Sequence, residues 1–225
     1  MMRSIMNILP VKICGITRME DALLAVELGA AAVGFVFYPK SSRCMDAEAA
    51  QRIGEQLPSH VARVGVFVNP DPETLHLTAE VAALTHIQLH GEESPYLCQL
   101  SPLPVIKNMR MAGLPAPAEL RNYPAPAFLV DGSKPGELSN VSTKADWEFA
   151  HKLREYKFTI IAGSLSADNL ALAVRLAQPD GVDLSSSVES KAGVKDAAKL
   201  RHFFATVKKL DYQESRLQQG FFSLV

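Results

Sequence analysis

The sequence predicts an α/β fold, a single (β/α)8 TIM barrel with a short C-terminal tail. Three observations lead to this prediction: short apolar segments alternate eight times with segments of helical periodicity, the apolar segments lack regular polar alternation, and the chain has 225 residues. Strands that are apolar along their whole length are typical of parallel sheets covered on both faces, and eight strand–helix units close a barrel. Single barrels of this kind commonly need roughly 200–250 residues.

The expected strands are short, rich in β-branched and aromatic residues, and followed by polar or glycine-containing turns. They cover residues 11–16, 31–37, 62–68, 86–90, 104–109, 127–131, 158–162 and 181–185. The expected helices have apolar residues three or four positions apart, and cover 19–28, 47–57, 73–83, 94–100, 116–122, 147–156, 167–177 and 196–210. Gly29 stands where the first helix should end. Side-chain oxygens placed to cap a following helix belong to Asp46, Asp71, Ser94, Asp146 and Ser166.

An open, doubly wound sheet is the alternative arrangement for alternating strands and helices. The turn after the first strand reads CGIT at 14–17 and lacks the GxGxxG pattern of dinucleotide-binding folds, which weakens this alternative. No shift in composition divides the chain into domains. We therefore expect residues 1–210 to form the barrel and residues 211–225 to form a tail that packs on it or frays.

Composition excludes several classes of function. Lys and Arg number 23 against 24 Asp and Glu, so the net charge of −1 offers no field for binding nucleic acid. No apolar run approaches the roughly 18–20 residues that cross a bilayer. The three cysteines, Cys14, Cys44 and Cys98, are too scattered for a disulfide framework or a zinc site. The sequence predicts a cytoplasmic protein without a metal ion, a membrane contact or a nucleic-acid partner.

Polar side chains concentrate where the expected strands end, which is where barrel enzymes carry their active sites. These residues are Lys12, Cys14, Arg43, Gln88, His90, Lys107, Arg110, Asp131, Asp183, Ser185, Ser186 and Ser187. A thiol, a carboxylate and several cations or amides suit proton transfer on a small anionic substrate better than hydrolysis, and no serine stands in a GxSxG turn. Taken singly, Cys14 is also typical of a small buried hydrophobe, Asp131 of a turn, and Arg43 of a solvated cation.

Several segments in a fixed order carry a resemblance to a known family. They are KICGI at 12–16, GFVFYPKS at 34–41 followed by Arg43, GVFVN at 65–69, QLHG at 88–91, VIK at 105–107, GVDLSS at 181–186, VES at 188–190 and GVKD at 193–196. Over residues 11–209 the sequence resembles the phosphoribosylanthranilate isomerases, barrel enzymes of tryptophan biosynthesis. The ordered set is far more specific than any single motif.

The resemblance implies an Amadori rearrangement of N-(5-phosphoribosyl)anthranilate, with Cys14 as general base and Asp131 as general acid. It implies that Arg43 receives the anthranilate carboxylate. Further substrate contacts are expected from Lys12, Gln88, His90, Arg110 and Asp183, and phosphate contacts from Gly163, Ser164, Ser185, Ser186 and Ser187. Lys12 stands two residues before Cys14 on the same strand face, where its charge would help to lower the thiol pKa. No cofactor is implied, and the protein is expected to be a monomer or a homodimer.

The sequence departs from the family around the phosphate. Residues 139–142 read SNVS where the family has a Gly-Gly-Thr-Gly turn, Gly163-Ser164 replaces Gly-Gly, and Ser187 replaces a glycine. Glycine lets a backbone approach an anion closely, so these changes leave two alternatives open. One is an isomerase for a different sugar-like or anionic substrate, and the other is a barrel that binds a ligand without turnover. The lysines and arginines near the last helix, including Lys195 and Lys199, are expected to form a solvated face.

Overall fold

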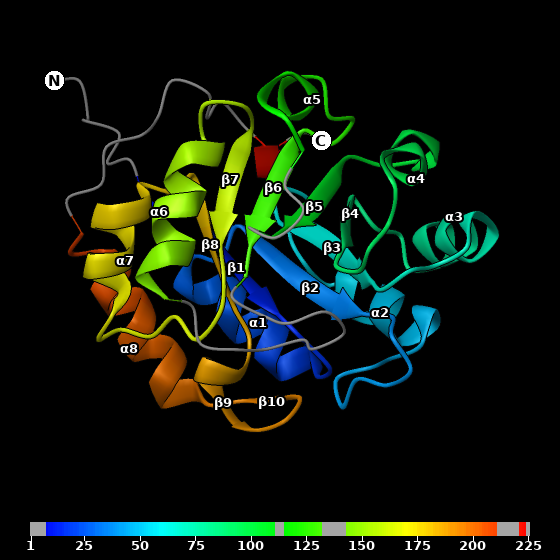
Figure 1. The fold of residues 1–225 in the computed structure, drawn as a ribbon. Coiled ribbons are helices and arrows are strands. Elements are labelled where there is room, and N and C mark those ends of the chain that lie inside the picture. Colours follow the sequence, from blue (N-terminus) through cyan, green and yellow to red (C-terminus); the bar gives the residue numbers. More distant parts are fainter. Residues whose placement is uncertain (1–7, 111–114, 132–142, 211–220, 224–225) are drawn as a thin grey trace, which may run out of the picture.

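The computed structural model of the chain describes residues 8–110, 115–131, 143–210 and 221–223. Eight parallel strands form a closed barrel in sequence order, because β8 pairs with β1 (Figure 1). The strands are β1 (Val11–Cys14), β2 (Ala32–Val36), β3 (Ala62–Phe67), β4 (His86–Leu89), β5 (Val105–Met109), β6 (Ala127–Val130), β7 (Phe158–Ile161) and β8 (Gly181–Leu184). The predicted (β/α)8 barrel is thus confirmed, and the open sheet is excluded.

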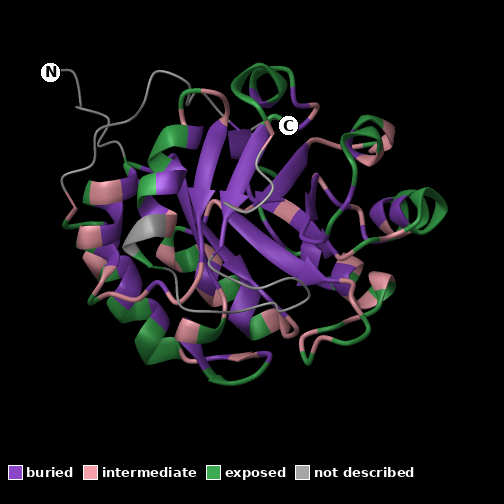
Figure 2. Ribbon diagram, viewed as in Figure 1, coloured by how far each residue is buried: buried purple, intermediate pink, exposed green. Residues whose placement is uncertain are grey.

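Helices surround the barrel, and Figure 2 shows buried strands inside and exposed helix faces outside. They are α1 (Met19–Leu28), α2 (Ala47–Gly54), α3 (Pro72–Val81), α4 (Pro95–Leu100), α5 (Pro117–Arg121), α6 (Lys144–Leu153), α7 (Leu170–Ala177) and α8 (Ala197–Val207). Every predicted strand and helix overlaps its observed counterpart. The differences lie at the ends of the elements.

Helix caps explain where the boundaries differ. Asp46 and Asp71 accept hydrogen bonds from the first turns of α2 and α3, and Gly29 ends α1 in the left-handed conformation at φ 112°, as predicted. Asp146 is not a cap: Thr143 caps α6, and Asp146 bonds back to the Thr143 backbone as the third residue of a capping box. The helix therefore begins three residues before the predicted start.

Ser94 occupies the predicted cap position of α4, whereas the predicted cap Ser166 is wrong. Ser94 precedes α4 without a side-chain capping bond, and Pro95 occupies the first helical position. Asn169 precedes α7, and its side chain accepts a hydrogen bond from the Ser166 backbone while donating one to the Ser164 carbonyl. The loop after β7 is consequently longer than predicted.

Two phenylalanines close the barrel at the N-terminal ends of the strands, where the short 3-10 turn η2 (Phe221–Ser223) lies at the strand starts in Figure 1. The Phe221 ring stacks on Phe158 with centroids 5.1 Å apart. The backbone carbonyl oxygen of Phe221 lies 2.9 Å from Nε2 of the buried His86. These contacts place residues 221 and 222 in the barrel core. The predicted domain boundary stays a prediction, since residues 211–220 lie outside the described part.

A two-stranded ribbon that the sequence pattern did not predict follows β8. It consists of β9 (Glu189–Lys191) and β10 (Val194–Lys195), preceded by the 3-10 turn η1 (Ser186–Val188). Figure 1 shows the ribbon at the end of the barrel opposite Phe221 and Phe222. Within the described residues, no helix has the length and apolarity to cross a membrane.

Candidate active site

A pocket opens at the C-terminal ends of the strands, with about 590 Å³ of empty space when the open solvent at its mouth is included. The predicted site residues that line it are Cys14, Arg43, Gln88, His90, Asp131, Gly163, Ser164, Asp183, Ser185, Ser186 and Ser187. Residues from the ends of six strands and from the loops after them thus meet in one place, although they are distant in sequence. Lys12 and Arg110 lie outside this lining.

Cys14 ends β1 and is paired in register with Gly34 on β2. A Cβ atom placed on Gly34 would lie 2.8 Å from the Cys14 sulfur and 3.0 Å from Nζ of Lys12. The missing side chain therefore leaves the space into which the thiol and the ammonium group converge. Any other residue at this position would force one of the two groups to move.

Lys12 is fully buried below the pocket, inside the barrel. Its Nζ lies 3.0 Å from Oδ1 of Asp183, which joins the first strand to the last. Burial alone would lower the pKa of Lys12, but the ion pair with Asp183 and the contact with Cys14 raise the pKa above its ordinary value. Lys12 therefore keeps its positive charge next to the thiol.

Burial raises the pKa of the Cys14 thiol above its ordinary value, although Lys12 and, less strongly, Lys195 oppose the shift. The positive charge expected from the sequence is present, but it does not outweigh desolvation. At neutral pH the thiol is therefore mostly protonated in the resting site. A base of this kind works through the small ionised fraction or after a change in its surroundings.

Across the pocket, three polar side chains form a row. Nε2 of Gln88 lies 3.1 Å from Nδ1 of His90, and Nε2 of His90 lies 3.5 Å from Oδ2 of Asp131. Oε1 of Gln88 and Oδ1 of Asp131 are buried and have no hydrogen-bond partner among the described residues. Buried polar atoms of this kind are normally satisfied, so these oxygens are available to hydroxyl or amine groups of a ligand.

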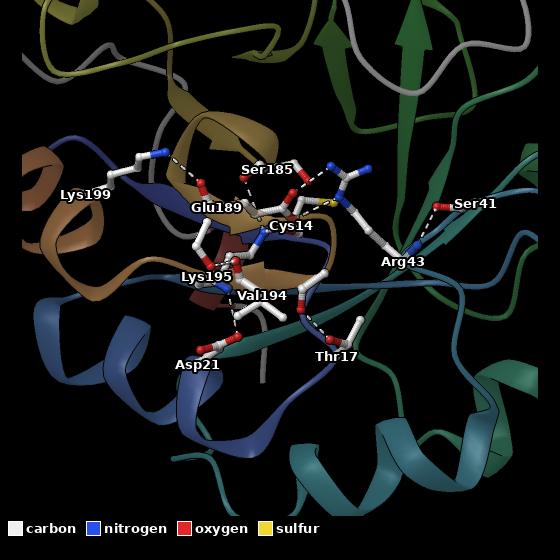
Figure 3. Close-up of polar contacts among 12 residues, drawn as sticks. Cys14, Thr17, Asp21, Ser41, Arg43, Ser185, Glu189, Val194, Lys195 and Lys199 are labelled. Carbon is white, nitrogen blue, oxygen red and sulfur yellow. Dashed lines mark hydrogen bonds and ion pairs between the residues drawn. The ribbon is translucent and has the colours of Figure 1, made fainter.

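Arg43 reaches the pocket from the loop after β2 and is held by Glu189 of the ribbon (Figure 3). Its Nε and Nη2 donate to the two carboxylate oxygens at 2.9 and 2.6 Å. The second partner of Glu189 is Lys195, whose Nζ lies 2.8 Å from Oε1. Arg43 is therefore not a solvated cation, and its guanidinium group has a fixed plane.

The expectation of a solvated face is wrong for Lys195 and correct for Lys199, which is exposed. Lys195 is 5% exposed and pairs with Glu189, and Nζ of Lys199 donates to the Glu189 carbonyl at 2.7 Å. Sequence reasoning missed Glu189 and Lys195 as site residues because they lie in the segment after β8, the last strand of the barrel, and not at the end of a barrel strand. The available signal was their position in the matched segments VES and GVKD.

The loops after β7 and β8 line the remaining side of the pocket. Gly163 and Ser164 both adopt left-handed backbone conformations, at φ 85° and 52°. Ser164 thus takes up a conformation that favours glycine, so replacing the family's glycine has not removed the local geometry. Ser185, Ser186 and Ser187 lead into η1. The segment 139–142, the largest departure from the family pattern, lies outside the described residues.

Arg110 lies beyond the pocket, next to His90. One of its terminal nitrogens donates to the His90 carbonyl at 3.5 Å, and the other lies 3.8 Å from the Glu92 carboxylate. It lines a neighbouring depression together with Lys107, whose Nζ pairs with Glu93 at 2.8 Å. Across the described parts of the chain, no group of three or more His, Cys, Asp and Glu side chains is placed to hold a metal ion.

Comparison with known proteins assigns the family. The family model for N-(5'phosphoribosyl)anthranilate (PRA) isomerase matches residues 11–206. The chain belongs to this family. A phosphoribosylanthranilate isomerase of Geobacter sp. (strain M21) is 44% identical over 200 residues, which are 89% of this chain and 98% of the relative.

Solved members of the phosphoribosylanthranilate isomerase family have the same fold. The Thermus thermophilus structure is 44% identical, has a TM-score of 0.80, and is matched over 88% of this chain and 98% of its own. A second isomerase structure, in complex with reduced 1-(o-carboxyphenylamino)-1-deoxyribulose 5-phosphate, is 38% identical with a TM-score of 0.76, over 90% of this chain and all of its own. The resemblance stated from the sequence is confirmed, and the protein is an isomerase of tryptophan biosynthesis.

Proposed function

We propose that the protein converts N-(5'-phosphoribosyl)anthranilate to 1-(2-carboxyphenylamino)-1-deoxyribulose 5-phosphate, with Asp131 as general acid and Cys14 as general base. The observation that carries this proposal is that Cys14, at the end of β1, and Asp131, directly after β6, line one pocket. An aldose-to-ketose rearrangement needs an acid and a base on one substrate, and it needs no oxidant because C2 is oxidised while C1 is reduced.

Two proton transfers by the protein precede a final tautomerisation of the product. Asp131 donates a proton to the ribose ring oxygen as the bond from that oxygen to C1 breaks, and the nitrogen lone pair forms the C1=N bond. Cys14 then removes the proton from C2, the C2–H electrons form C1=C2, and the iminium electrons return to nitrogen. The resulting enolamine takes up a proton at C1 and releases the proton of its C2 hydroxyl group, so that the C1=C2 bond is replaced by the C2=O bond of the ketone. Lys12 assists the second step by its positive charge next to the thiolate.

The remaining residues bind the two ends and the middle of the substrate. Arg43 offers a planar donor for the anthranilate carboxylate. Gln88, His90 and Asp183 face the ribose, where the unpartnered oxygen of Gln88 can accept from a hydroxyl group and the unpartnered oxygen of Asp131 can carry the proton that it donates. The serine-rich loops after β7 and β8 hold the phosphate through backbone N–H groups and hydroxyls, and these residues are Gly163, Ser164, Ser185, Ser186 and Ser187. Arg110 acts indirectly, by its bond to the His90 carbonyl.

The cellular setting follows from the same proposal. A biosynthetic isomerase with a phosphorylated substrate works in the cytoplasm, and none of the proposed steps uses a cofactor. A Thermotoga maritima relative is described as a dimeric enzyme from which monomers were generated. A monomer or a homodimer is therefore the assembly we propose for this chain.

A steady-state assay with freshly generated phosphoribosylanthranilate, following loss of anthranilate fluorescence, tests the proposal. We expect turnover by the wild type, and loss of nearly all turnover in Cys14→Ala and in Asp131→Asn. The matched control is Cys44→Ala, since Cys44 is an exposed thiol that does not line the pocket. Wild-type rates in either site variant would remove that residue from its role. No turnover by folded wild-type protein would instead favour an isomerase with a different substrate or a non-catalytic barrel.

A further inference from the structure

Arg43, Glu189 and Lys195 form a cluster of alternating charges beside the acid–base pair. Glu189 lies between the two cations, with its side chain 4% exposed. Arg43 contacts both carboxylate oxygens and Lys195 contacts Oε1 (Figure 3). A buried carboxylate with two cationic partners carries no net negative charge into the pocket.

The cluster also fixes the end of β1. Nζ of Lys195 donates to the Cys14 carbonyl at 2.6 Å and to the Ser185 carbonyl at 3.3 Å. The hydrocarbon stem of Arg43 packs over Gly15, where an added Cβ would lie 2.5 Å from Cδ of Arg43. Lys195 and Arg43 therefore contact the backbone next to the Cys14 thiol, and Glu189 links these two cations.

The ribbon is itself tied to the outside of the barrel. The Lys195 backbone N–H donates to Oδ2 of the buried Asp21 on α1 at 2.9 Å. Lys199 on α8 donates to the Glu189 carbonyl at 2.7 Å. The Glu189 carbonyl and the paired residue Lys195 on β10 are thus anchored, so that α8 and α1 help to set the position of the Glu189 carboxylate.

We propose that Glu189 is a positioning residue that aims Arg43 at the aromatic carboxylate of the substrate, and that Lys195 makes this possible by neutralising Glu189. The inference rests on the proposed role of Arg43. Nε and Nη2 of Arg43 donate to Glu189, which leaves Nη1 to bind the carboxylate of the substrate.

Charge balance explains why the proposal includes Lys195. Without Lys195, the charges of Arg43 and Glu189 would cancel, and the pocket would offer no net attraction to a carboxylate. With Lys195 present, the cluster has one surplus positive charge next to the pocket. Burial alone would raise the pKa of Glu189, but Arg43 and Lys195 lower the pKa below its ordinary value, so the carboxylate stays ionised.

A double-mutant cycle on Arg43 and Glu189 tests the inference. The variants are Arg43→Ala, Glu189→Gln and the two together, and the measurements are KM, kcat and the affinities for free anthranilate and for inorganic phosphate. We expect each single variant to raise KM and to weaken anthranilate binding roughly 10- to 150-fold, the range of a charge-assisted hydrogen bond. Phosphate affinity should stay within about twofold, because the side chains of Arg43 and Glu189 bond to each other and to Lys195 rather than to the serine side chains of the phosphate loops.

The KM of the double variant is the decisive measurement. If Glu189 acts through Arg43, Glu189→Gln adds less than about twofold to KM once Arg43 is alanine. A purely structural role of Glu189 would weaken phosphate binding as well, and its effect would persist in the Arg43→Ala background. Either of these results overturns the inference, as does an unchanged KM in Glu189→Gln.

Two lysines of the same ribbon provide a matched pair. Lys195→Met should raise KM as Glu189→Gln does, whereas Lys191→Met, the same substitution at an exposed position, should leave KM unchanged. If Glu189→Gln does not fold, Glu189→Asp replaces it in the double-mutant cycle. The rise in KM should then be smaller than that expected for Glu189→Gln, because the charge remains. An unchanged KM in Arg43→Ala would instead refute the proposed role of Arg43, and with it this inference, while Cys14 and Asp131 would still be tested by their own variants.

Discussion

Gly34 shows how much the site depends on a single missing side chain. It leaves the space shared by the Cys14 sulfur and Nζ of Lys12. We expect Gly34→Ala to lower kcat by tenfold or more and to destabilise the fold by about 1–3 kcal/mol, because the added methyl group overpacks the barrel interior. Steady-state kinetics and urea unfolding measure the two effects.

The control is Gly54→Ala on α2. There a Cβ meets only the flexible side chain of Arg63, and alanine favours the helix. This variant should retain wild-type kinetics. Full activity in Gly34→Ala would mean that the thiol and the ammonium group need not converge for catalysis.

The raised pKa of Cys14 predicts the pH dependence of the reaction. The thiolate is the reactive form, so kcat/KM should rise with pH and should still be rising above about pH 8.5, the usual pKa of a cysteine. Lys195→Met should move the rising limb to higher pH, because it removes a positive charge that lowers the thiol pKa. Lys191→Met should leave it in place. A plateau below pH 8 in the wild type would contradict the prediction.

At the residue scale, the sequence was sufficient to predict the site residues that lie at the ends of barrel strands. Cys14, Gln88, Asp131 and Asp183 each lie within one residue of the end of a strand, so their convergence follows from the barrel itself. Glu189 was not predictable in this way. Its partners Arg43 and Lys195 come from different loops, and the contact with Arg43 spans 146 positions of the sequence. Such a pairing depends on how two irregular segments meet in space.

At the scale of elements, the starts of helices were harder to predict than their existence. Apolar spacing identified α6 and α7, but the caps come from competition among neighbouring polar residues. Thr143 and Asp146 both have side chains that accept from a backbone N–H, and the capping box assigns the first position to Thr143. Either residue fits the pattern when the sequence is considered alone.

The turn at residues 221–223 is an element whose contribution can be tested without touching the site. Phe221 is 8% exposed and packs on Phe158 and His86 at the strand starts. We expect Phe221→Ala to lower the free energy of unfolding by about 3 kcal/mol, because it leaves a cavity in the barrel core. The turnover number of the folded protein should not change, because the pocket lies at the other end of the barrel.

Urea unfolding followed by far-UV circular dichroism measures this loss. Tyr96→Ala is the matched aromatic control, since that side chain is 65% exposed. A loss below about 0.5 kcal/mol, the usual effect of a surface substitution, would show that the turn does not stabilise the barrel.

At the scale of the whole molecule, buried carboxylates predict how stability depends on pH. Arg43 and Lys195 lower the pKa of Glu189 against the effect of burial, and Lys107 does the same for Glu93. The unfolded chain therefore binds more protons than the folded chain between the lowered pKa values and about pH 4.5, so stability falls as the pH decreases through that window.

The expected slope is at most about 1.4 kcal/mol per pH unit for each carboxylate. Urea midpoints measured between pH 3 and 7 should show this decrease in the wild type and a smaller one in Glu93→Gln. The variant will be less stable at neutral pH, since Lys107 loses its ionic partner. Equal slopes in the two proteins would refute the assignment for Glu93.

The fold of the whole molecule was predictable because many weak signals agreed. Each of the eight strand–helix units has its own periodicity, and eight units with strands apolar on both faces fit closure into a barrel. The ribbon β9–β10 was not predictable, because it is too short to show periodicity. It is formed by contacts with α1, α8 and the end of β1, which exist only after the barrel has closed.

The ion pair between Lys12 and Asp183 links strands at opposite ends of the chain, 171 positions apart. Contacts of such long range form late, because a large loop must close before they contribute. An intermediate with β1 and β8 still apart would retain the other strand pairs and most of the secondary structure. It would nevertheless lack the buried cation beside Cys14 and the floor of the pocket. During refolding, the recovery of enzymatic activity should therefore lag behind the recovery of the circular dichroism signal.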